Sequence, residues 1–259
     1  MKFRIKSEEE VELLRQSNII VSKALAEVAR MIQPGVTTLQ LDERAEEFIR
    51  DHGAEPGFKG FRGFPNTLCT SVNSEVVHGI PSNYQLKEGD IISVDCGVLV
   101  NGYYGDTAFT FAVGEVDGEI GRLMRTTRES LMKGVEQAIA GNRLGDIGHA
   151  VQQHAESNGF SVVRELVGHG LGTGLHEPPE VPNYGRRGRG PILPDGLVIC
   201  IEPMINQGGK EVIQERDGWT IRTLDQKPSA HYEYAMVVRK SKADVLSTFD
   251  FIDEVLKNK

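Results

Sequence analysis

The sequence predicts an α+β fold built of two related halves, each containing two helices followed by strands. Gly35 to Gly53 and Gly141 to Gly159 bracket helical patterns with the same spacing. The segments L-K-E-G-D-I-I-S-V-D and L-P-D-G-L-V-I-C-I-E end at Asp95 and Glu202, and they share the first leucine, the turn glycine, the apolar strand positions and the terminal acid. Repetition of this kind predicts an internal pseudo-symmetry, with the two final acids at equivalent positions.

Two helices open the first half. Ser7 and Glu10 have the spacing of a capping box, and apolar residues then recur at helical intervals until Pro34-Gly35 stops the pattern. A second helix is expected from Thr38 to just before Gly53, because glycine tolerates the positive φ of a helix C-terminal cap. The glycine-rich segment 58–65, F-K-G-F-R-G-F-P, follows. Its three phenylalanines predict either an apolar pocket or a cap on the core.

A β-hairpin is predicted next, after a short strand L-C-T-S-V. Residues 91–110 contain two apolar, β-branched strands joined by Asn101-Gly102, a dipeptide typical of two-residue hairpin turns. If the strands pair, the carboxylates of Asp95 and Asp106 converge. Two carboxylates in a low dielectric repel each other and raise each other's pKa unless a cation lies between them. The hairpin therefore predicts part of a metal site.

The second half repeats the helices and is then rich in strands. Apolar periodicity predicts one helix that ends at Gly141 and a shorter one that ends at Gly159. Strands are expected at 161–167, 197–202, 211–215, 219–223 and 231–238, with a short helix after Asp250. Because the two halves, about 1–113 and 114–259, would share a site on their axis, we expect a single domain over residues 1–259.

Composition excludes several classes of protein. The chain has 259 residues, of which 39% are hydrophobic and 25% charged, enough for an ordinary folded core. A net charge of −8 disfavours DNA as a partner, because phosphate binding needs clustered basic residues. No apolar run is long enough to cross a bilayer and the N-terminus lacks a signal-peptide core, so we expect a cytoplasmic protein without a membrane partner. Cys69, Cys96 and Cys200 form no C-x-x-C pair, which predicts reduced thiols.

Three polar residues of the second half can complete the metal site. His169, Glu202 and Glu233 lie among apolar or glycine neighbours, where an isolated charge is costly. Taken singly, each has an ordinary structural explanation. Together with Asp95 and Asp106 they form four carboxylates and one imidazole, a set that suits two divalent ions such as Co, Mn, Fe(II) or Zn. Two such ions can activate water for hydrolysis.

Two further histidines lie in turn-rich segments, His78 in V-V-H-G-I-P and His176 in G-L-H-E-P-P. A side chain in such a segment can point into a cleft. Imidazole titrates near neutral pH and can donate or accept a hydrogen bond. These two residues are therefore candidates for proton transfer or for contacts with a substrate amide.

The motifs together resemble those of the type I methionine aminopeptidases, a family with the pita-bread fold. The resemblance spans nearly the whole chain, through N-T-L-C-T-S-V-N, V-V-H-G-I-P, G-D-I-I-S-V-D, N-G-Y-Y-G-D-T-A, G-H-G-L-G, L-H-E-P-P-E-V-P-N-Y-G, I-E-P-M and S-A-H-Y-E. It implies a curved, mainly antiparallel sheet. So many ordered motifs are far more specific than any single one.

The resemblance implies a role for each candidate residue. Asp95, Asp106, His169, Glu202 and Glu233 would be the five ligands of two divalent ions, with Asp106 and Glu233 bridging both. Glu202 would also act as general base. His78 and His176 would contact the substrate. The pocket for the methionine side chain would be formed by Phe58, Phe61, Phe64, Cys69, Leu175 and Trp219.

The implied activity is removal of the initiator methionine from nascent proteins with a small second residue, by a monomer in the cytoplasm. Two departures from the family pattern bear on rate or metal preference: G-H-G-L-G-T-G replaces G-H-G-I-G-R, and Tyr234 stands where a histidine more often follows the glutamate. The basic segment 185–190, G-R-R-G-R-G, is interpreted as a solvated loop, with transient contact with the ribosome as the alternative.

Two other functions remain open. A related pita-bread peptidase that cleaves before proline would use a similar ligand set, although such relatives usually carry an extra N-terminal domain. A catalytically silent binding protein on the same scaffold would be expected to have lost ligands, and all five are present.

Overall fold

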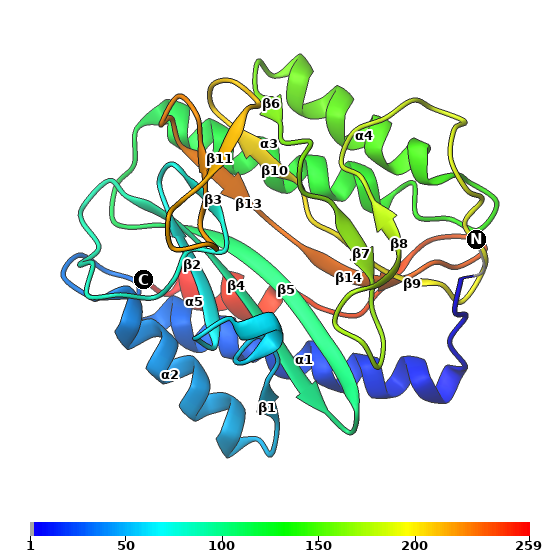
Figure 1. The fold of residues 1–259 in the computed structure, drawn as a ribbon, viewed down its shortest axis with the longest axis horizontal. Coiled ribbons are helices and arrows are strands. Elements are labelled where there is room, and N and C mark those ends of the chain that lie inside the picture. Colours follow the sequence, from blue (N-terminus) through cyan, green and yellow to red (C-terminus); the bar gives the residue numbers. More distant parts are fainter. Residues whose placement is uncertain (1–2) are drawn as a thin grey trace.

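The computed structural model describes residues 3–259 and confirms the predicted α+β fold (Figure 1). Long strands run through the centre of the molecule, with α1, α2 and α5 on one side and α3 and α4 on the other (Figure 1). Every pair of neighbouring named strands in this part of the chain is antiparallel. None of the helices within residues 3–259 combines the length and the apolar character that a membrane crossing requires.

The first two helices begin and end as their capping residues predict. Helix α1 (Glu8–Met31) has a complete capping box, in which Ser7 Oγ accepts from the Glu10 N–H and the Glu10 carboxylate accepts from the Ser7 N–H. Helix α2 (Thr38–Asp51) is capped in the same way by Thr37. Gly53 follows it with a φ of 68°, as expected for a glycine at a helix C-terminus.

The predicted hairpin forms the central sheet of the first half. Strands β4 (Ile91–Val100) and β5 (Tyr103–Ala112) pair in one continuous register. The turn residues Asn101 and Gly102 both have positive φ, 51° and 79°, which matches the twist of a two-residue hairpin. The other edge of β4 is covered by two short strands, β1 (Glu55–Pro56) and β2 (Leu68–Val72).

The second half repeats this order with one helix shorter than expected. Helix α3 (Gly118–Val135) ends before Gly141, so the prediction of a helix up to that glycine was wrong. The reason is a competing partner: the Ala140 N–H donates to the Arg239 carbonyl, 2.9 Å away, which draws this segment out of the helix. Helix α4 (Leu144–Ser157) lies where the sequence places it.

Strands of the second half are shorter and more numerous than predicted. They are β6 (Ser161–Val162), β7 (Gly168–Gly170), β8 (Glu177–Val181), β9 (Val198–Ile201), β10 (Met204–Asn206), β11 (Val212–Gln214), β12 (Ile221–Thr223), β13 (Ser229–His231), β14 (Tyr234–Val237) and β15 (Asp244–Val245), joined by β3 (Glu75–Val77) from the first half; helix α5 (Asp250–Lys257) ends the chain. The expected strand 231–238 is broken at residues 232–233, and the expected strand 161–167 leaves the sheet after residue 162.

The segment 198–206 is interrupted in the same way, between the end of β9 and the start of β10. Strand β9 pairs with β14, whereas the strands on the far side of the break, β10 and β13, pair with each other in a different sheet. Glu202 and Glu233 both lie in the gap. Two carboxylates are thereby placed next to each other where the backbone changes direction.

Backbone conformation supports the repeat between the two halves. Helices α2 and α4 are of equal length, 14 residues each. The glycines at equivalent places have similar positive φ angles: Gly35 and Gly141 (91° and 99°), Gly53 and Gly159 (68° and 81°), Gly89 and Gly196 (86° and 82°). Since L residues rarely adopt this conformation, the matched glycines fix the same turns in both halves.

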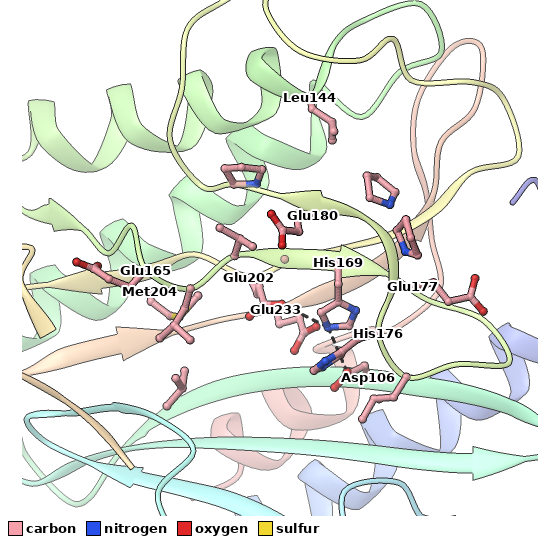
Figure 2. A pocket seen from close by; sticks show the side chains of 18 of the residues that line it. Asp106, Leu144, Glu165, His169, His176, Glu177, Glu180, Glu202, Met204 and Glu233 are labelled. Carbon is pink, nitrogen blue, oxygen red and sulfur yellow. Dashed lines mark ion pairs between the residues drawn. The ribbon is translucent and has the colours of Figure 1, made fainter. Parts of the chain in front are cut away.

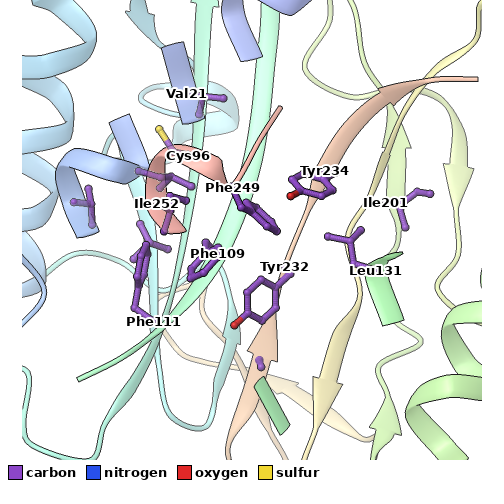
Figure 3. Close-up of a cluster of buried hydrophobic side chains, with 14 of the residues drawn as sticks. Val21, Cys96, Phe109, Phe111, Leu131, Ile201, Tyr232, Tyr234, Phe249 and Ile252 are labelled. Carbon is purple, nitrogen blue, oxygen red and sulfur yellow. The ribbon is translucent and has the colours of Figure 1, made fainter. Parts of the chain in front are cut away.

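The halves join through side chains of β5. The Thr110 hydroxyl donates to the His231 carbonyl (2.7 Å) and accepts from the His231 N–H (2.9 Å), while the Thr107 hydroxyl donates to the Glu233 carbonyl (2.6 Å). Figure 3 shows the apolar side of this junction, where Phe109, Tyr232 and Phe249 pack together in one core. The broken segment is thus fixed to the hairpin that carries the two aspartates.

Candidate metal centre

The five predicted metal ligands come from both halves and meet at the junction. Asp95 and Asp106 lie on β4 and β5, His169 lies on β7, and Glu202 and Glu233 lie in the gap between strands. Figure 2 shows the side chains of Asp106, His169, Glu202 and Glu233 directed toward one another. The sequence thus identified residues that the fold brings together from distant parts of the chain.

His169 is oriented by its own backbone neighbour. Its Nδ1 lies 3.0 Å from the Gly170 carbonyl, so this nitrogen carries the proton and donates it. Its Nε2 then offers a lone pair, 3.4 Å from Glu202 Oε1 and 3.7 Å from Asp106 Oδ2. Burial lowers the pKa of His169 to about 3, and His176 adds to this effect, which keeps the ring neutral as a metal ligand requires.

Three of the carboxylates each have one oxygen atom without a protein partner in the described part of the chain. Asp95 Oδ1, Asp106 Oδ1 and Glu233 Oε1 are buried and accept no hydrogen bond within the described residues. Burial raises the pKa of Asp95 to about 7. The pKa values of Asp106, Glu202 and Glu233 lie well above their usual range, first because of burial and then because of neighbouring carboxylates. Unpartnered acceptors in this arrangement fit divalent cations, which would neutralise the charge.

Cys200 is a neighbour of this site that sequence reasoning placed only among apolar strand residues. One ligand atom from each of Asp106, His169, Cys200 and Glu233 lies within 4.8 Å of the others. Cys200 lies on β9, two residues before Glu202. The alternation of side chains in I-C-I-E could have predicted that Cys200 and Glu202 both face the site. Burial raises the pKa of its thiol, so it is neutral. All three cysteines are buried and unpaired, as expected.

His231 is a second residue that the sequence analysis did not assign. It is 1% exposed, its Nε2 lies 3.9 Å from Glu202 Oε2, and neither ring nitrogen has a hydrogen-bond partner within residues 3–259. Burial lowers its pKa to about 3. Its position two residues before Glu233 is the signal that could have identified it, because alternate residues of an extended segment face the same side.

A cavity of about 990 Å³ opens over the metal centre. All the residues predicted for substrate and metal line it: Phe58, Phe61, Phe64, Cys69, His78, Asp95, Asp106, His169, Leu175, His176, Glu202, Trp219 and Glu233. Phe58, Phe64, Cys69 and Leu175 are buried and form one apolar cluster against which Phe61 and Trp219 pack. The apolar pocket that the phenylalanines of segment 58–65 predict is therefore present.

The two remaining histidines face this cavity from opposite segments. His78 follows β3 with a φ of 61°, a strained conformation for a residue other than glycine. The His176 ring is 4.3 Å from the His169 ring, centroid to centroid, and meets the edge of Phe61 at 5.3 Å. Burial lowers the pKa of His78 to about 4 and also lowers that of His176. Both rings are neutral at pH 7.

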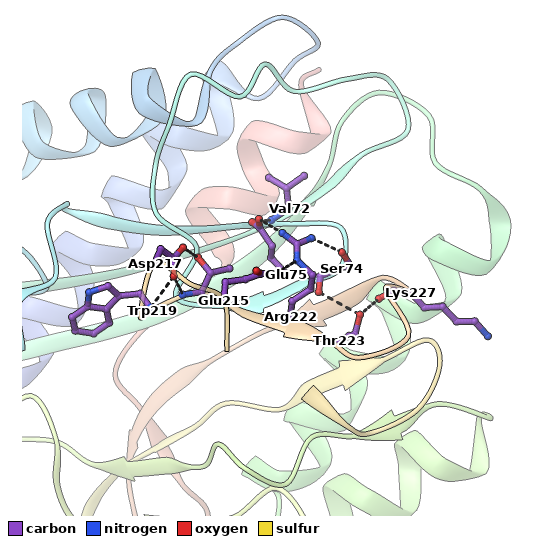
Figure 4. A network of polar contacts seen from close by, with 10 residues as sticks. Val72, Ser74, Glu75, Glu215, Asp217, Trp219, Arg222, Thr223 and Lys227 are labelled. Carbon is purple, nitrogen blue, oxygen red and sulfur yellow. Dashed lines mark hydrogen bonds and ion pairs between the residues drawn. The ribbon is translucent and has the colours of Figure 1, made fainter. Parts of the chain in front are cut away.

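A polar network fixes the wall that carries Trp219 (Figure 4). The Arg222 guanidinium donates to Glu75 (3.0 Å), Glu215 (2.7 Å) and Ser74 (2.7 Å), which ties β12 to β3. The Asp217 carboxylate accepts from the backbone N–H of Trp219, 2.8 Å away. The indole is thus held on an ordered turn at the edge of the cavity.

Tyr234, the departure from the family pattern, lies away from the ligands. It is largely buried, and its ring packs against Phe249 with the centroids 4.1 Å apart (Figure 3). Because Tyr234 follows Glu233 in an extended segment, its side chain points to the opposite face of the sheet. It therefore contributes to the core between the halves.

Comparison with known proteins agrees with this geometry. Residues 12–240 match the model of metallopeptidase family M24. The chain is 50% identical over 243 residues to the methionine aminopeptidase of Clostridium perfringens, covering 94% of this chain and 98% of the relative. It is 45% identical over 242 residues to methionine aminopeptidase 1 of Bacillus subtilis, covering 93% and 98% of the two chains.

Solved structures confirm the pita-bread fold. The crystal structure of methionine aminopeptidase from Rickettsia prowazekii superposes with a TM-score of 0.94 at 38% identity and covers 95% of this chain and 100% of that chain. The Xaa-Pro dipeptidase from Bacillus anthracis shares the fold alone, with a TM-score of 0.76 at 20% identity, and the match covers 94% of this chain and 62% of the dipeptidase. By sequence, fold and the residues of its candidate metal centre, the chain belongs to metallopeptidase family M24.

Proposed function

We propose that this chain is a methionine aminopeptidase that removes the initiator methionine from nascent proteins whose second residue is small. The observation that carries the proposal is the position of the five ligand candidates beneath an apolar cavity lined by phenylalanine, leucine and tryptophan. A long thioether side chain fits soft, aromatic walls. The bond to be cleaved would then lie over the carboxylates.

Two divalent cations would be held by Asp95, Asp106, His169, Glu202 and Glu233, with Asp106 and Glu233 shared between them. The donor set, oxygen-rich with one imidazole, suits Co, Mn, Fe(II) or Zn. When bound, the cations would polarise the scissile carbonyl and lower the pKa of a water molecule.

Side chains that line the cavity would bind the substrate and transfer the proton. The apolar cluster fixes the methionine side chain and excludes water from it. The neutral rings of His78 and His176 can each donate one hydrogen bond and accept another, so they suit the carbonyl and N–H of a peptide bond. Glu202 would accept the proton of the attacking water on a carboxylate oxygen and transfer it to the leaving amine.

A peptide panel tests the proposal. Metal-reconstituted protein is expected to release methionine from Met-Ala-Ser and to leave Xaa-Pro peptides intact. Cleavage of the proline peptides alone would assign the chain to the prolidase-type branch of the fold. Failure to release methionine from protein that binds two divalent ions would point to a silent binding protein.

The cellular setting is also part of this proposal: a monomer that acts in the cytoplasm on nascent chains. Arg186, Arg187 and Arg189 of the basic loop are exposed, which fits the solvated loop predicted from the sequence. If the loop instead contacts the ribosome, a variant with all three arginines replaced by serine would cosediment less with ribosomes than the unmodified protein does.

A further inference from the structure

A row of rings leads from the metal centre to the mouth of the cavity and ends at an arginine. The His169 and His176 rings lie 4.3 Å apart with their planes tilted by 49°, and the His176 and Phe61 rings form an edge contact at 5.3 Å. The Arg62 guanidinium carbon lies 5.3 Å from the centre of the Phe61 ring. The last contact is within the range of a cation–π interaction. Arg62 thus has a defined position relative to the reacting bond.

The loop that carries Arg62 is built to hold it. Arg62 adopts the left-handed conformation, with a φ of 50°, between Gly60 and Gly63, whose φ angles are 85° and 90°. Backbone hydrogen bonds close the turn, from the Gly60 N–H to the Phe64 carbonyl (2.8 Å) and from the Phe64 N–H to the Phe61 carbonyl (3.0 Å). A left-handed residue other than glycine is strained, and such strain persists only where the surrounding structure fixes the residue.

The guanidinium is a free positive charge at the cavity mouth. Arg62 lines the cavity and is exposed, and within residues 3–259 it forms no ion pair and no side-chain hydrogen bond. Lys6, by contrast, is paired with Glu177, 2.6 Å away, whereas Arg186 and Arg189 are further exposed arginines that line the cavity.

We propose that Arg62 is a specificity-determining residue that favours substrates with a carboxylate shortly after the cleaved bond. The inference rests on the proposed function, which places the methionine side chain in the apolar pocket and the cleaved bond beside His176. The remainder of the substrate then leaves past Phe61 and Arg62. A guanidinium offers paired N–H donors that match a carboxylate, and here no protein carboxylate competes for them.

The carboxylate can come from an acidic side chain at the third residue or from the C-terminus of a short peptide. The experiment therefore compares kcat/KM for Met-Ala-Asp-Ser amide and Met-Ala-Asn-Ser amide, and for Met-Ala-Ser with a free and an amidated C-terminus. At low ionic strength we expect each carboxylate to raise kcat/KM about two- to five-fold, the size of an exposed ion pair. High salt should reduce the ratio, since it screens exposed charges.

Three variants test whether Arg62 causes the preference for peptides with a carboxylate. Arg62→Met should bring the Asp/Asn ratio to about one while leaving turnover of the Asn peptide within about two-fold, because only the charge is removed. Arg62→Lys should keep part of the ratio. Arg189→Met is the matched control, another exposed arginine that lines the cavity, and it should leave the ratio unchanged.

Equal cleavage of the acidic and neutral peptides by the unmodified protein overturns this inference alone, as does an Asp/Asn ratio that survives Arg62→Met. Loss of the ratio in Arg189→Met as well would show a diffuse charge effect and would also overturn it. If neither methionine peptide is cleaved, the proposed function fails and this inference fails with it. A preference in only one of the two peptide pairs supports the inference and identifies the source of the carboxylate.

Discussion

Burial shifts the pKa values of the ionisable residues of the candidate metal centre toward the neutral forms of their side chains. Burial raises the pKa of Asp95 from 3.8 to about 7 and lowers the pKa of His169 from 6.5 to about 3. A carboxylate whose pKa is higher in the folded state stabilises the protein below its unfolded pKa, and this contribution is lost as the pH rises through the folded value. The histidine acts in the opposite direction, since its contribution is lost as the pH falls from 6.5 toward 3.

The variant Asp95→Asn isolates the contribution of the Asp95 carboxyl group to the pH dependence of stability. In the presence of a chelator, the variant should gain stability relative to the unmodified protein as the pH rises from about 4 to about 7, because the amide cannot ionise. Urea unfolding at several pH values measures the difference. Excess divalent metal should reverse the sign of this stability difference, because the variant lacks one metal ligand. A difference that does not change with pH would contradict the raised pKa of the buried Asp95 carboxyl.

Asp106→Ala and His78→Ala separate metal binding from substrate contact. Asp106 is expected to bridge two cations, so its loss should abolish both tight metal binding and turnover. His78 faces the cavity without belonging to the ligand set, so His78→Ala should keep its metal content while kcat falls about 10²-fold, the usual size of a proton-transfer contribution. Metal analysis alongside methionine release checks both. An equal loss of metal in the two variants would contradict this division of roles.

At the scale of elements, the site depends on the close approach of helix α1 to β5. A Cβ added at Gly105 would lie 2.5 Å from the backbone carbon of Ser17, and the next residue, Asp106, donates its N–H to Asn18 Oδ1. Gly105→Ala should therefore separate helix from strand and cost about 1–3 kcal/mol of unfolding free energy, as overpacking does. Metal affinity should fall as well, because Asp106 moves with the strand.

Gly121→Ala is the matched control for that substitution. Gly121 lies inside α3, and a Cβ there would meet nothing within 4 Å. Alanine is the better helix former, so this variant should gain about 0.5–1 kcal/mol. Thermal unfolding of both variants measures the contrast. A Gly105→Ala variant as stable as the unmodified protein would show that α1 can shift without cost.

Elements whose signals are local could be predicted from the sequence. The capping boxes, the positive-φ glycines and the Asn101-Gly102 turn each act within a few residues, and the corresponding helices and the hairpin lie where expected. Strands β8 and β10 were missed, since β8 contains two prolines and β10 has only three residues. The early end of α3 depends on a hydrogen bond to Arg239, about a hundred residues away, which no local pattern records.

The same distinction holds for the candidate site. The five ligand candidates were identifiable because each is a polar residue in an apolar setting, a contrast visible in the sequence. His231 and Cys200 were not assigned, although each lies two residues before a ligand candidate, Glu233 and Glu202 respectively. Their significance depends on the break between β13 and β14 and on the pairing of β9, which place them beside Glu202 and Glu233.

At the scale of the whole molecule, the site lies on the junction between the two halves, so metal binding and the integrity of the junction are coupled. The halves share one apolar cluster, in which Phe109 of the first contacts Tyr232 of the second. Division of residues 1–259 into separate domains would split the ligand set. The described residues, 3–259, are therefore expected to unfold as one cooperative unit.

Thr110→Val tests this coupling. Thr110 is fully buried, and its hydroxyl bonds both backbone groups of His231 and the Ser93 hydroxyl, so valine would remove a partner from three buried groups at a cost of about 2–4 kcal/mol. Thr110→Ser keeps the hydroxyl and should lose much less. Calorimetry should give a single transition for all three proteins, with Thr110→Val alone shifted strongly downward and weakened in metal binding. Two transitions would mean that the halves unfold separately. Loss of stability with unchanged metal affinity would mean that the positions of the metal ligands do not depend on the junction between the halves.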